Sequence, residues 1–302
     1  MTLLVLVLLA TSIGGAVAAL TWRSSSAAHR MAPLVAETAR RAGAAIRRRR
    51  GRRDLLAAKL NPEAATGLAL TLAPAAIVGG GVLLGLLTYL VRGNTDLIRL
   101  DNSVASWGDR HASAVATYGL DAITQLGEPV VVAALAAVLA LVETLRTRSR
   151  WVVPFLALVV AGNGILTTTV KNLVDRVRPA LNPVAETLGP SFPSGHSSWS
   201  AAFLAAAALL LSRGRSRRAR AAIAGVAAGL AVTVAGSRVL LDVHWLSDVI
   251  AGLALGSAWF AICAVAFGGR LLRFGAAVEE ASRAAGGRGG AHPPPSAARS
   301  GR

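Results

Sequence analysis

The chain has 302 residues, of which 54% are hydrophobic and only 16% are charged, whereas about 25% of the residues of a soluble domain are charged. Its 32 Lys and Arg residues outnumber its 15 Asp and Glu residues, which gives a net charge of +17. This composition excludes an ordinary soluble enzyme and favours a membrane protein. A single cysteine, Cys263, excludes an internal disulfide, and it lies in an apolar run where a thiol behaves as a small hydrophobic group.

The first hydrophobic run covers residues 1–20. Small residues such as Ala16 and Ala18 would suit a cleaved signal peptide, but the run has no basic region before it. Cleavage would also place the following arginine-rich segment outside the cell, against the positive-inside rule. We therefore expect residues 1–23 to form an additional membrane span, with a misassigned start codon as the alternative.

Residues 24–65 are basic and alanine-rich and are expected to form a cytoplasmic linker. Their RRRRGRR sequence is compatible with nucleic-acid binding. Arginine clusters beside membrane spans, however, set the topology and contact anionic lipids. We therefore expect a juxtamembrane anchor and no nucleic-acid partner.

Six further apolar stretches are each close to the roughly 20 residues that a spanning helix needs. They lie near residues 67–91, 129–145, 151–171, 196–213, 220–240 and 247–268. They predict an all-α, polytopic membrane helix bundle with a six-helix core over residues 66–273. Residues 274–302 are rich in glycine and proline towards their end and are expected to form a disordered tail.

Arginine gathers in three segments: before the first core helix, between the second and third, and between the fourth and fifth. Even numbers of crossings separate these segments, so all three lie on one side, which the positive-inside rule makes cytoplasmic. The chain is thus expected to be a multi-pass protein of a bacterial-type cell membrane. The loops at 92–128, 172–195 and 241–246 would then face outwards.

The first outer loop, residues 94–127, has an amphipathic pattern. Its apolar and aromatic residues recur at helical spacing: Val104, Trp107, His111, Val115 and Tyr118. We expect one helix lying in the outer interface, where it caps the bundle; guiding a lipid headgroup inwards is the alternative.

The second outer loop begins with two cations. Lys171 and Arg178 are seven residues apart and would share a helix face if the helix persisted to Pro179. Both are hydrogen-bond donors suited to an anion. The alternative is that Asp175, four residues after Lys171, pairs with both as exposed salt bridges.

The same loop ends in Pro-Ser-Gly-His before an apolar helix. Ser194 can cap that helix, and Gly195 lets the main chain approach a ligand. Helix N-termini bind phosphate, and His196 would stand beside such an anion. An ordinary turn is the alternative.

Near the third outer loop, His244 and Asp248 are spaced i to i+4. This spacing lets the carboxylate accept the imidazole N–H and leaves the other ring nitrogen free as a nucleophile or base. Arg238 would add a further cation. A purely structural His–Asp hydrogen bond is the alternative.

Helix parity brings these groups to one membrane face, where three cations, a helix N-terminus and two histidines meet the needs of phosphoryl transfer. Zinc is the competing interpretation, with His111, His196, His244 and Asp248 as ligands. Because three neighbouring cations would repel a divalent ion, we expect no metal and no cofactor.

The segments KNLVDRVRP, PSGH and SRVLLDVHWLSD together resemble the three signature motifs of the type 2 phosphatidic acid phosphatase (PAP2) family. The resemblance implies a six-helix core acting without metal, with His244 as nucleophile, His196 as general acid and Asp248 orienting the nucleophile. The implied phosphate-binding residues are Lys171, Arg178, Ser194, Gly195 and Arg238. The chain departs from the pattern at Asp242, which is often glycine in the family.

We therefore expect an integral membrane phosphatase that hydrolyses a lipid phosphate or diphosphate at the outer leaflet through a phosphohistidine. The substrate would be of the phosphatidic acid, phosphatidylglycerophosphate or polyprenyl diphosphate type. A lipid-dependent phosphotransferase would use the same covalent step and stays open. A transporter or channel is less favoured, because only Asn163 and Thr167–Thr169 offer polar groups near the midplane. The oligomeric state is left open.

Overall fold

The computed structural model describes residues 1–23, 66–111, 113–179 and 189–287, and these ranges form helices without any strand. The expected linker at 24–65 lies outside the described residues. The elements are an N-terminal helix (Thr2–Arg23), α3 (Thr66–Leu90), α4 (Thr95–Arg110), α5 (Ala114–Thr124), the 3-10 turn η1 (Gln125–Gly127), α6 (Pro129–Thr147), α7 (Val152–Val174), α8 (Gly195–Leu211), α9 (Arg217–Leu240) and α10 (Leu246–Gly287).

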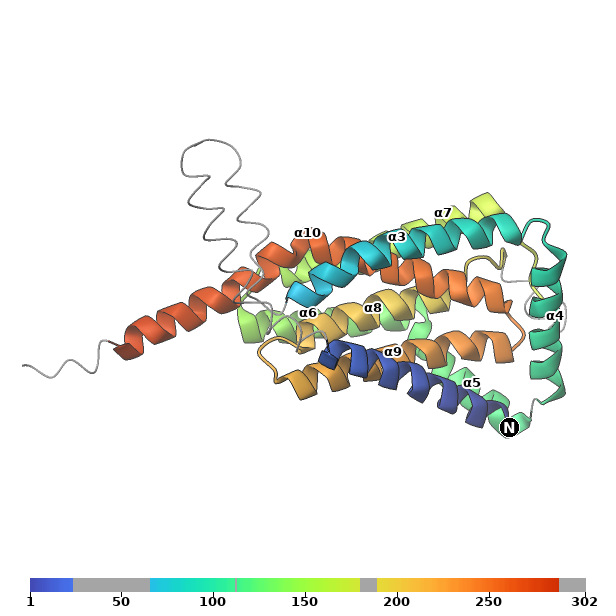
Figure 1. Ribbon diagram of the computed structural model, residues 1–302, viewed down its shortest axis with the longest axis horizontal. Coiled ribbons are helices and arrows are strands. Elements are labelled where there is room, and N and C mark those ends of the chain that lie inside the picture. The colour runs from blue at the N-terminus through green and yellow to red at the C-terminus, as the bar shows by residue number, and fades with distance from the viewer. Residues whose placement is uncertain (24–65, 112, 180–188, 288–302) are drawn as a thin grey trace, which may run out of the picture.

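The six expected core helices are α3, α6, α7, α8, α9 and α10. Within the described ranges, six helices are long and apolar enough to cross a membrane: the N-terminal helix and all core helices except α8. α8 has 17 residues and packs between α7, α9 and α10 in the middle of the bundle (Figure 1). The prediction of an all-α, polytopic membrane bundle with an extra N-terminal span is confirmed.

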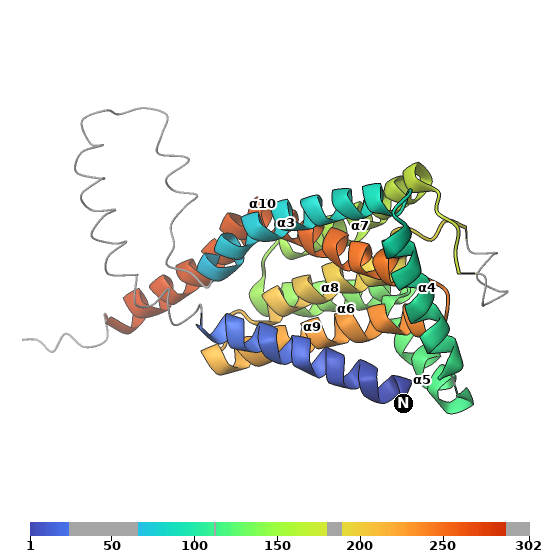
Figure 2. The same ribbon diagram turned by 45° about the vertical axis from the view of Figure 1, so that its right-hand side comes forward.

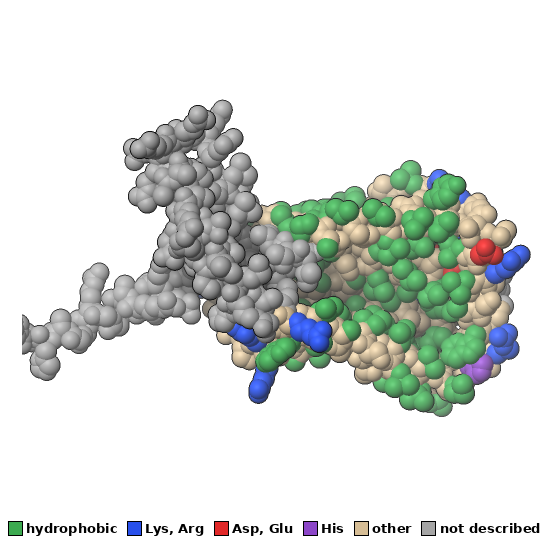
Figure 3. All heavy atoms as spheres, in the orientation of Figure 1, with side chains coloured by type: hydrophobic (Ala, Val, Ile, Leu, Met, Phe, Trp, Pro, Cys, Tyr) green, Lys and Arg blue, Asp and Glu red, His purple; other side chains and the backbone are tan. Residues whose placement is uncertain are grey.

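The surface of the bundle suits a membrane. Large apolar side chains point outwards from the sides of the helices, including Val82, Leu141 and Ile165, which are 62–68% exposed. In Figure 3 such side chains cover the length of the face shown, whereas Lys and Arg lie towards its two ends. Apolar sides with polar ends are expected of a protein surrounded by lipid.

The two ends of the bundle differ. One end, here called the site end, holds the C-termini of α7 and α9 and the N-termini of α8 and α10 (Figure 1). The other, the arginine end, holds the α6–α7 and α8–α9 connections, which carry Arg148, Arg150, Arg213 and Arg215. This arrangement agrees with the parity argument for where the polar motifs meet.

The outer loop that we expected to form one interfacial helix contains two. α4 starts after Asn94, whose side chain accepts from Leu97 N, and α5 starts after Ser113, whose hydroxyl accepts from Ala116 N. The single-helix prediction was wrong because Ser113 is in an extended conformation and begins a second helix. α4 lies across the site end in both ribbon views (Figures 1 and 2).

α10 continues to Gly287, beyond Phe274, where we expected a disordered tail to begin. The added segment is rich in alanine, glutamate and arginine, which have high helix propensity. Residues 288–302 lie outside the described part of the chain.

The N-terminal helix lies along α9 (Figure 2). The two backbones approach closely where glycines face each other: a Cβ atom added at Gly14 would lie 2.6 Å from the carbonyl oxygen of Gly225, and one added at Gly225 would lie 2.7 Å from that of Gly14. Small residues allow such close helix packing in lipid. This helix is therefore an integral part of the described bundle.

Candidate active site

Lys171 and Arg178 come together in a different way from the shared helix face that we expected. α7 ends at Val174, because Asp175 adopts a left-handed conformation with φ of 48°. The chain then folds back, so that Lys171 Nζ donates to Pro190 O at 2.5 Å and Arg178 Nε donates to Gly189 O at 2.8 Å. A loop, rather than a continuous helix, brings the two cations together.

The alternative role of Asp175 is not supported by these contacts. Its side chain is exposed at the C-cap of α7. Lys171 and Arg178 bond instead to main-chain carbonyls of the returning loop. The Asp175 carboxylate therefore does not neutralise the positive charges of Lys171 and Arg178.

His244 lies between Arg178 and Asp248. Its Nδ1 is 3.4 Å from Asp248 Oδ2, and its Nε2 is 3.2 Å from Arg178 Nη1. Arginine can only donate, so Nε2 is the acceptor of that contact and carries no proton. The proton of the neutral ring is consequently on Nδ1, towards Asp248.

His244 is buried, with 2% of its surface exposed. Burial lowers the pKa of His244 to about 4, while the hydrogen bond and the charge of Asp248 act in the opposite direction. Burial likewise lowers the pKa of Arg178 from its ordinary value, and Asp248 opposes this effect. At neutral pH the site thus pairs a neutral imidazole with a nearby guanidinium.

Ser194 caps α8 in the buried centre of the site end. Its hydroxyl accepts from Ser197 N and from Ser197 Oγ, and its own N–H donates to Asp248 O at 2.9 Å. α10 can approach this turn because Gly252 has no side chain; a Cβ atom there would lie 2.5 Å from Ser194 O. The N-terminus of α8, including Gly195, is thereby held against the start of α10.

His196 occupies the first turn of α8. Its Nε2 lies 3.1 Å from Oε2 of Glu128, the N-cap residue of α6. Lys171, Arg178 and Arg238 are all close enough for their charges to act on His196. The structure thus brings the two histidines, the three cations and the α8 N-terminus together at the site end.

Arg238 reaches the site from the last turn of α9 and is 8% exposed. One guanidinium nitrogen, Nη1, donates to Thr124 Oγ1 at 3.0 Å. Nε is buried and has no hydrogen-bond partner within the part of the chain that the structure describes. A buried donor without a partner is costly, so this group favours an anionic ligand.

Sequence reasoning missed Arg176 and two of its partners, Ser247 and Asp101. Arg176 Nη1 donates to Asp248 Oδ1 at 2.6 Å and to Ser247 Oγ at 2.7 Å, while Nη2 donates to Asp101 Oδ2 at 2.8 Å. Asp101 also accepts from Ser247 N at 2.9 Å. Part of this could have been found in the sequence: the spacing of Asp101, Ala105 and Gly108 indicates one helix face, and these residues form the buried face of α4.

Asp242, the departure from the family pattern, has a left-handed backbone with φ of 53°. Glycine adopts this conformation without strain. Burial and repulsion from Asp109 raise the pKa of Asp242 to about 6, and none of the described residues forms a hydrogen bond with its Oδ1. A carboxylate at this turn therefore carries both a backbone and a desolvation cost.

His111, one of the four residues of the zinc alternative, is engaged elsewhere. Its Nδ1 is 2.8 Å from Trp107 O, and its ring stacks on Trp107 with centroids 4.8 Å apart. Across the described ranges, no group of three or more His, Cys, Asp or Glu side chains is arranged to hold a metal ion.

The fold and this site define a class: a multi-pass membrane helix bundle with a buried cationic and histidine-containing site at one end. In the comparison with known proteins, the model of the PAP2 superfamily matches residues 151–271 of this chain. The matched part of the chain, from α7 into α10, is therefore similar to the PAP2 superfamily.

Three known proteins show the similarity. A lipid A 1-phosphatase of Rhizobium johnstonii is 34% identical over 137 residues, covering 40% of this chain and 52% of that protein. Phosphatidylglycerophosphatase B of Bacillus subtilis is 34% identical over 114 residues, covering 36% and 55%. The chain thus matches about half the length of these relatives. The crystal structure of a transmembrane PAP2-type phosphatidylglycerolphosphate phosphatase from Bacillus subtilis superimposes with a TM-score of 0.57 and 25% identity, covering 62% of this chain and 92% of that one.

Proposed function

We propose that this protein hydrolyses the phosphate monoester or diphosphate of a lipid through a phosphohistidine on His244. The observation that carries the proposal is the arrangement of His244: Asp248 faces its Nδ1, and Arg178 faces its unprotonated Nε2. An oriented neutral imidazole beside cations is suited to attack a phosphorus atom.

Substrate binding would place the phosphoryl group at the α8 N-terminus. Ser194, Gly195 and the main-chain N–H groups of that turn would contact its oxygens. Lys171, Arg178 and Arg238 would neutralise its charge, with Arg178 turning from His244 Nε2 to a phosphate oxygen. These contacts would strengthen as charge spreads over the equatorial oxygens.

In the first step, the lone pair of His244 Nε2 would form a bond to phosphorus while the bond from phosphorus to the lipid oxygen breaks. His196, acting as general acid, would give its proton to the leaving oxygen. Glu128, 3.1 Å from His196 Nε2, would stabilise the protonated ring. Asp248 would stabilise the positive charge that His244 gains.

In the second step, water would attack phosphorus, and His196, now neutral, would accept the water proton. The N–P bond would break, its electrons returning to His244 Nε2, and inorganic phosphate would leave. None of these steps calls for a metal ion, because the site's cations already oppose the phosphate charge.

The apolar bundle supports a lipid substrate, and the relatives named for lipid A and phosphatidylglycerophosphate support lipids with an exposed phosphate. We propose phosphatidic acid, phosphatidylglycerophosphate and polyprenyl diphosphate as the substrates to test. With the arginine end in the cytoplasm, the site would face the outside of a bacterial-type plasma membrane, at the outer leaflet.

The test is phosphate release by the purified full chain from these three lipids in mixed micelles containing EDTA. Release from at least one lipid is expected, together with an acid-labile phosphoenzyme after quenching with a ³²P-labelled substrate. The matched control is His244→Ala, which should show neither. Activity that EDTA removes and zinc restores would contradict the metal-independent mechanism, and phosphoenzyme in His244→Ala would contradict the nucleophile.

A further inference from the structure

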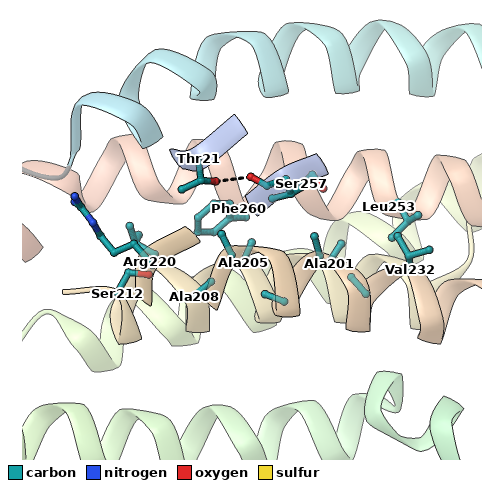
Figure 4. Close-up of a pocket in the computed structure, with 16 residues that line it drawn as sticks. Thr21, Ala201, Ala205, Ala208, Ser212, Arg220, Val232, Leu253, Ser257 and Phe260 are labelled. Atoms are coloured by element: carbon teal, nitrogen blue, oxygen red, sulfur yellow. Dashed lines mark hydrogen bonds between the residues drawn. The ribbon is translucent and has the colours of Figure 1, made fainter. Parts of the chain in front are cut away.

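A second feature lies away from the site end, between the N-terminal helix, α8, α9 and α10. It is a cavity of about 410 Å³ (Figure 4), within the range of about 300–1,000 Å³ typical of small-molecule sites. Seven alanines line it: Ala201, Ala205, Ala208, Ala224, Ala227, Ala228 and Ala231. Alanine side chains at facing positions leave space between the helices, and this space is apolar.

The cavity is elongated along the helices. On α8 and its C-cap residue the lining runs from Ala201 to Ser212, and on α9 it runs from Arg220 to Val232. The α8 stretch is about 17 Å long at a rise of 1.5 Å per residue, which is close to half of the roughly 30 Å hydrocarbon core of a bilayer. The cavity thus has the length of the hydrocarbon of one leaflet.

The two ends of the cavity differ in polarity. Figure 4 shows Leu253 and Val232 at one end and Arg220 at the other. Arg220 and Ser212 flank the α8–α9 connection at the arginine end. The Nε atom of Arg220 is buried and has no hydrogen-bond partner among the described residues, so this end attracts an anion that can accept hydrogen bonds.

We infer that the cavity binds one acyl chain of an anionic phospholipid from the leaflet opposite the site, with the lipid phosphate contacting Arg220. The apolar lining excludes a hydrated ligand along most of its length. The length fits a chain entering from the arginine end, and the charge of Arg220 complements the headgroup. Thr21 of the N-terminal helix faces Ser257 of α10 across the cavity (Figure 4), so the N-terminal helix forms part of this lipid site.

The test is native mass spectrometry of the purified full chain in detergent with equal amounts of phosphatidylglycerol and phosphatidylcholine of identical acyl chains. Phosphatidylglycerol is a phosphodiester and contains no phosphate monoester for the proposed reaction. The wild type should retain one phosphatidylglycerol molecule in preference to phosphatidylcholine. Arg220→Gln should lower this retention at least fivefold and abolish the preference.

Ala228→Phe should fill the cavity and remove both lipids. Val226→Phe is the matched control, since Val226 is on the same helix but 63% exposed, and it should retain the wild-type amount. His244→Ala should also retain it, which separates this site from the proposed reaction. Wild-type protein that holds no lipid or does not discriminate between the two headgroups would overturn the inference, as would equal loss in both phenylalanine variants. If another segment of the chain occupied the cavity, the wild-type protein would hold no lipid.

Discussion

Arg176 donates a hydrogen bond of 2.6 Å to Oδ1 of Asp248, the carboxylate oxygen that does not face His244. The same guanidinium holds Asp101 of α4 through Nη2. Arg176 is 13% exposed and these two carboxylates are at most 1% exposed. Under the proposed mechanism, the orientation of the nucleophile thus depends on a helix that lies across the end of the bundle.

Arg176→Gln is expected to lower kcat about 10–100-fold, because a hydrogen bond to a charged group contributes about 1.5–3 kcal/mol. KM should change less than threefold, since the contacts of Arg176 are to Asp248, Ser247 and Asp101 rather than to the phosphate-binding groups. His244 should also titrate at a higher pH, because the Asp248 carboxylate loses its cationic partner. The measurements are steady-state kinetics on a lipid phosphate and the pH dependence of kcat/KM.

Arg176→Lys should fall between wild type and Arg176→Gln, because an ammonium keeps the charge but cannot bridge both carboxylates in the same way. Arg99→Gln is the control; it breaks an Arg–Asp pair on α4 whose side chains are 78% and 83% exposed. A large rise in KM with constant kcat for Arg176→Gln would instead place Arg176 on the substrate.

The two histidines are expected to differ in their response to the leaving group. His196→Ala should lower the activity on an alkyl lipid phosphate about 10²–10⁴-fold, the usual contribution of a general acid. The loss of activity should be far smaller on an aryl phosphate, because its phenolate leaves without a proton. Glu128→Gln should show the same dependence with a smaller loss of about tenfold. Parallel assays of both substrates check this, and equal losses on both would contradict the acid role.

The pH at which kcat/KM falls on the acid side should lie well below the ordinary pKa of histidine. The attacking form of His244 is neutral, and its pKa is lowered to about 4, so kcat/KM should stay high at pH 5.5 and fall as the pH drops towards 4. Asp248→Asn removes the group that raises this pKa, so the fall in kcat/KM should move to a lower pH still while kcat falls. A wild-type fall centred near pH 6.5 would show that His244 is not held neutral by burial.

Asp242→Asn is expected to raise the thermal stability at pH 7.5. Because the folded-state pKa of Asp242 is raised to about 6, its native state holds a proton more tightly than the unfolded chain, and stability falls as the pH rises through the range from about 4 to 6. Asparagine removes the charge and tolerates the left-handed backbone. The Tm in detergent should increase by about 2–4 °C, the shift typical of 1 kcal/mol.

At pH 4 the Asp242→Asn gain should largely disappear, because the wild-type carboxyl is then protonated. Asp96→Asn, which alters an exposed carboxylate of α4, should change the Tm little at either pH. An equal gain for Asp242→Asn at pH 4 and pH 7.5 would assign the effect to the backbone rather than to the charge.

The proposed topology predicts the accessibility of single cysteines in the Cys263→Ala background. Tyr118 is 81% exposed at the site end, and Arg215 is exposed in the α8–α9 connection at the arginine end. In intact cells an impermeant maleimide should label Tyr118→Cys, and it should label Arg215→Cys only after the membrane is opened. The opposite pattern would place the site in the cytoplasm.

The spans could be predicted because hydropathy depends on local composition. That the three motifs meet at one end of the bundle could be predicted because they lie at helix ends that parity brings together. What the sequence left undetermined depends on local backbone geometry or on distant contacts. The turn at Asp175 and the second N-cap at Ser113 change the chain direction within one residue. The bond from Arg176 to Asp101 joins residues 75 positions apart, and no periodicity indicates such a pair.

The contact between Gly14 and Gly225 limits what can replace the N-terminal helix. Lipid tails are as apolar as leucine, so a hydrophobic segment gains nothing from leaving lipid for α9 unless the two backbones fit closely. A polyleucine segment would still insert into the bilayer, but its side chains would hold it away from Gly225. The first 23 residues therefore act as a shaped component of the bundle, for which a generic membrane anchor is no substitute.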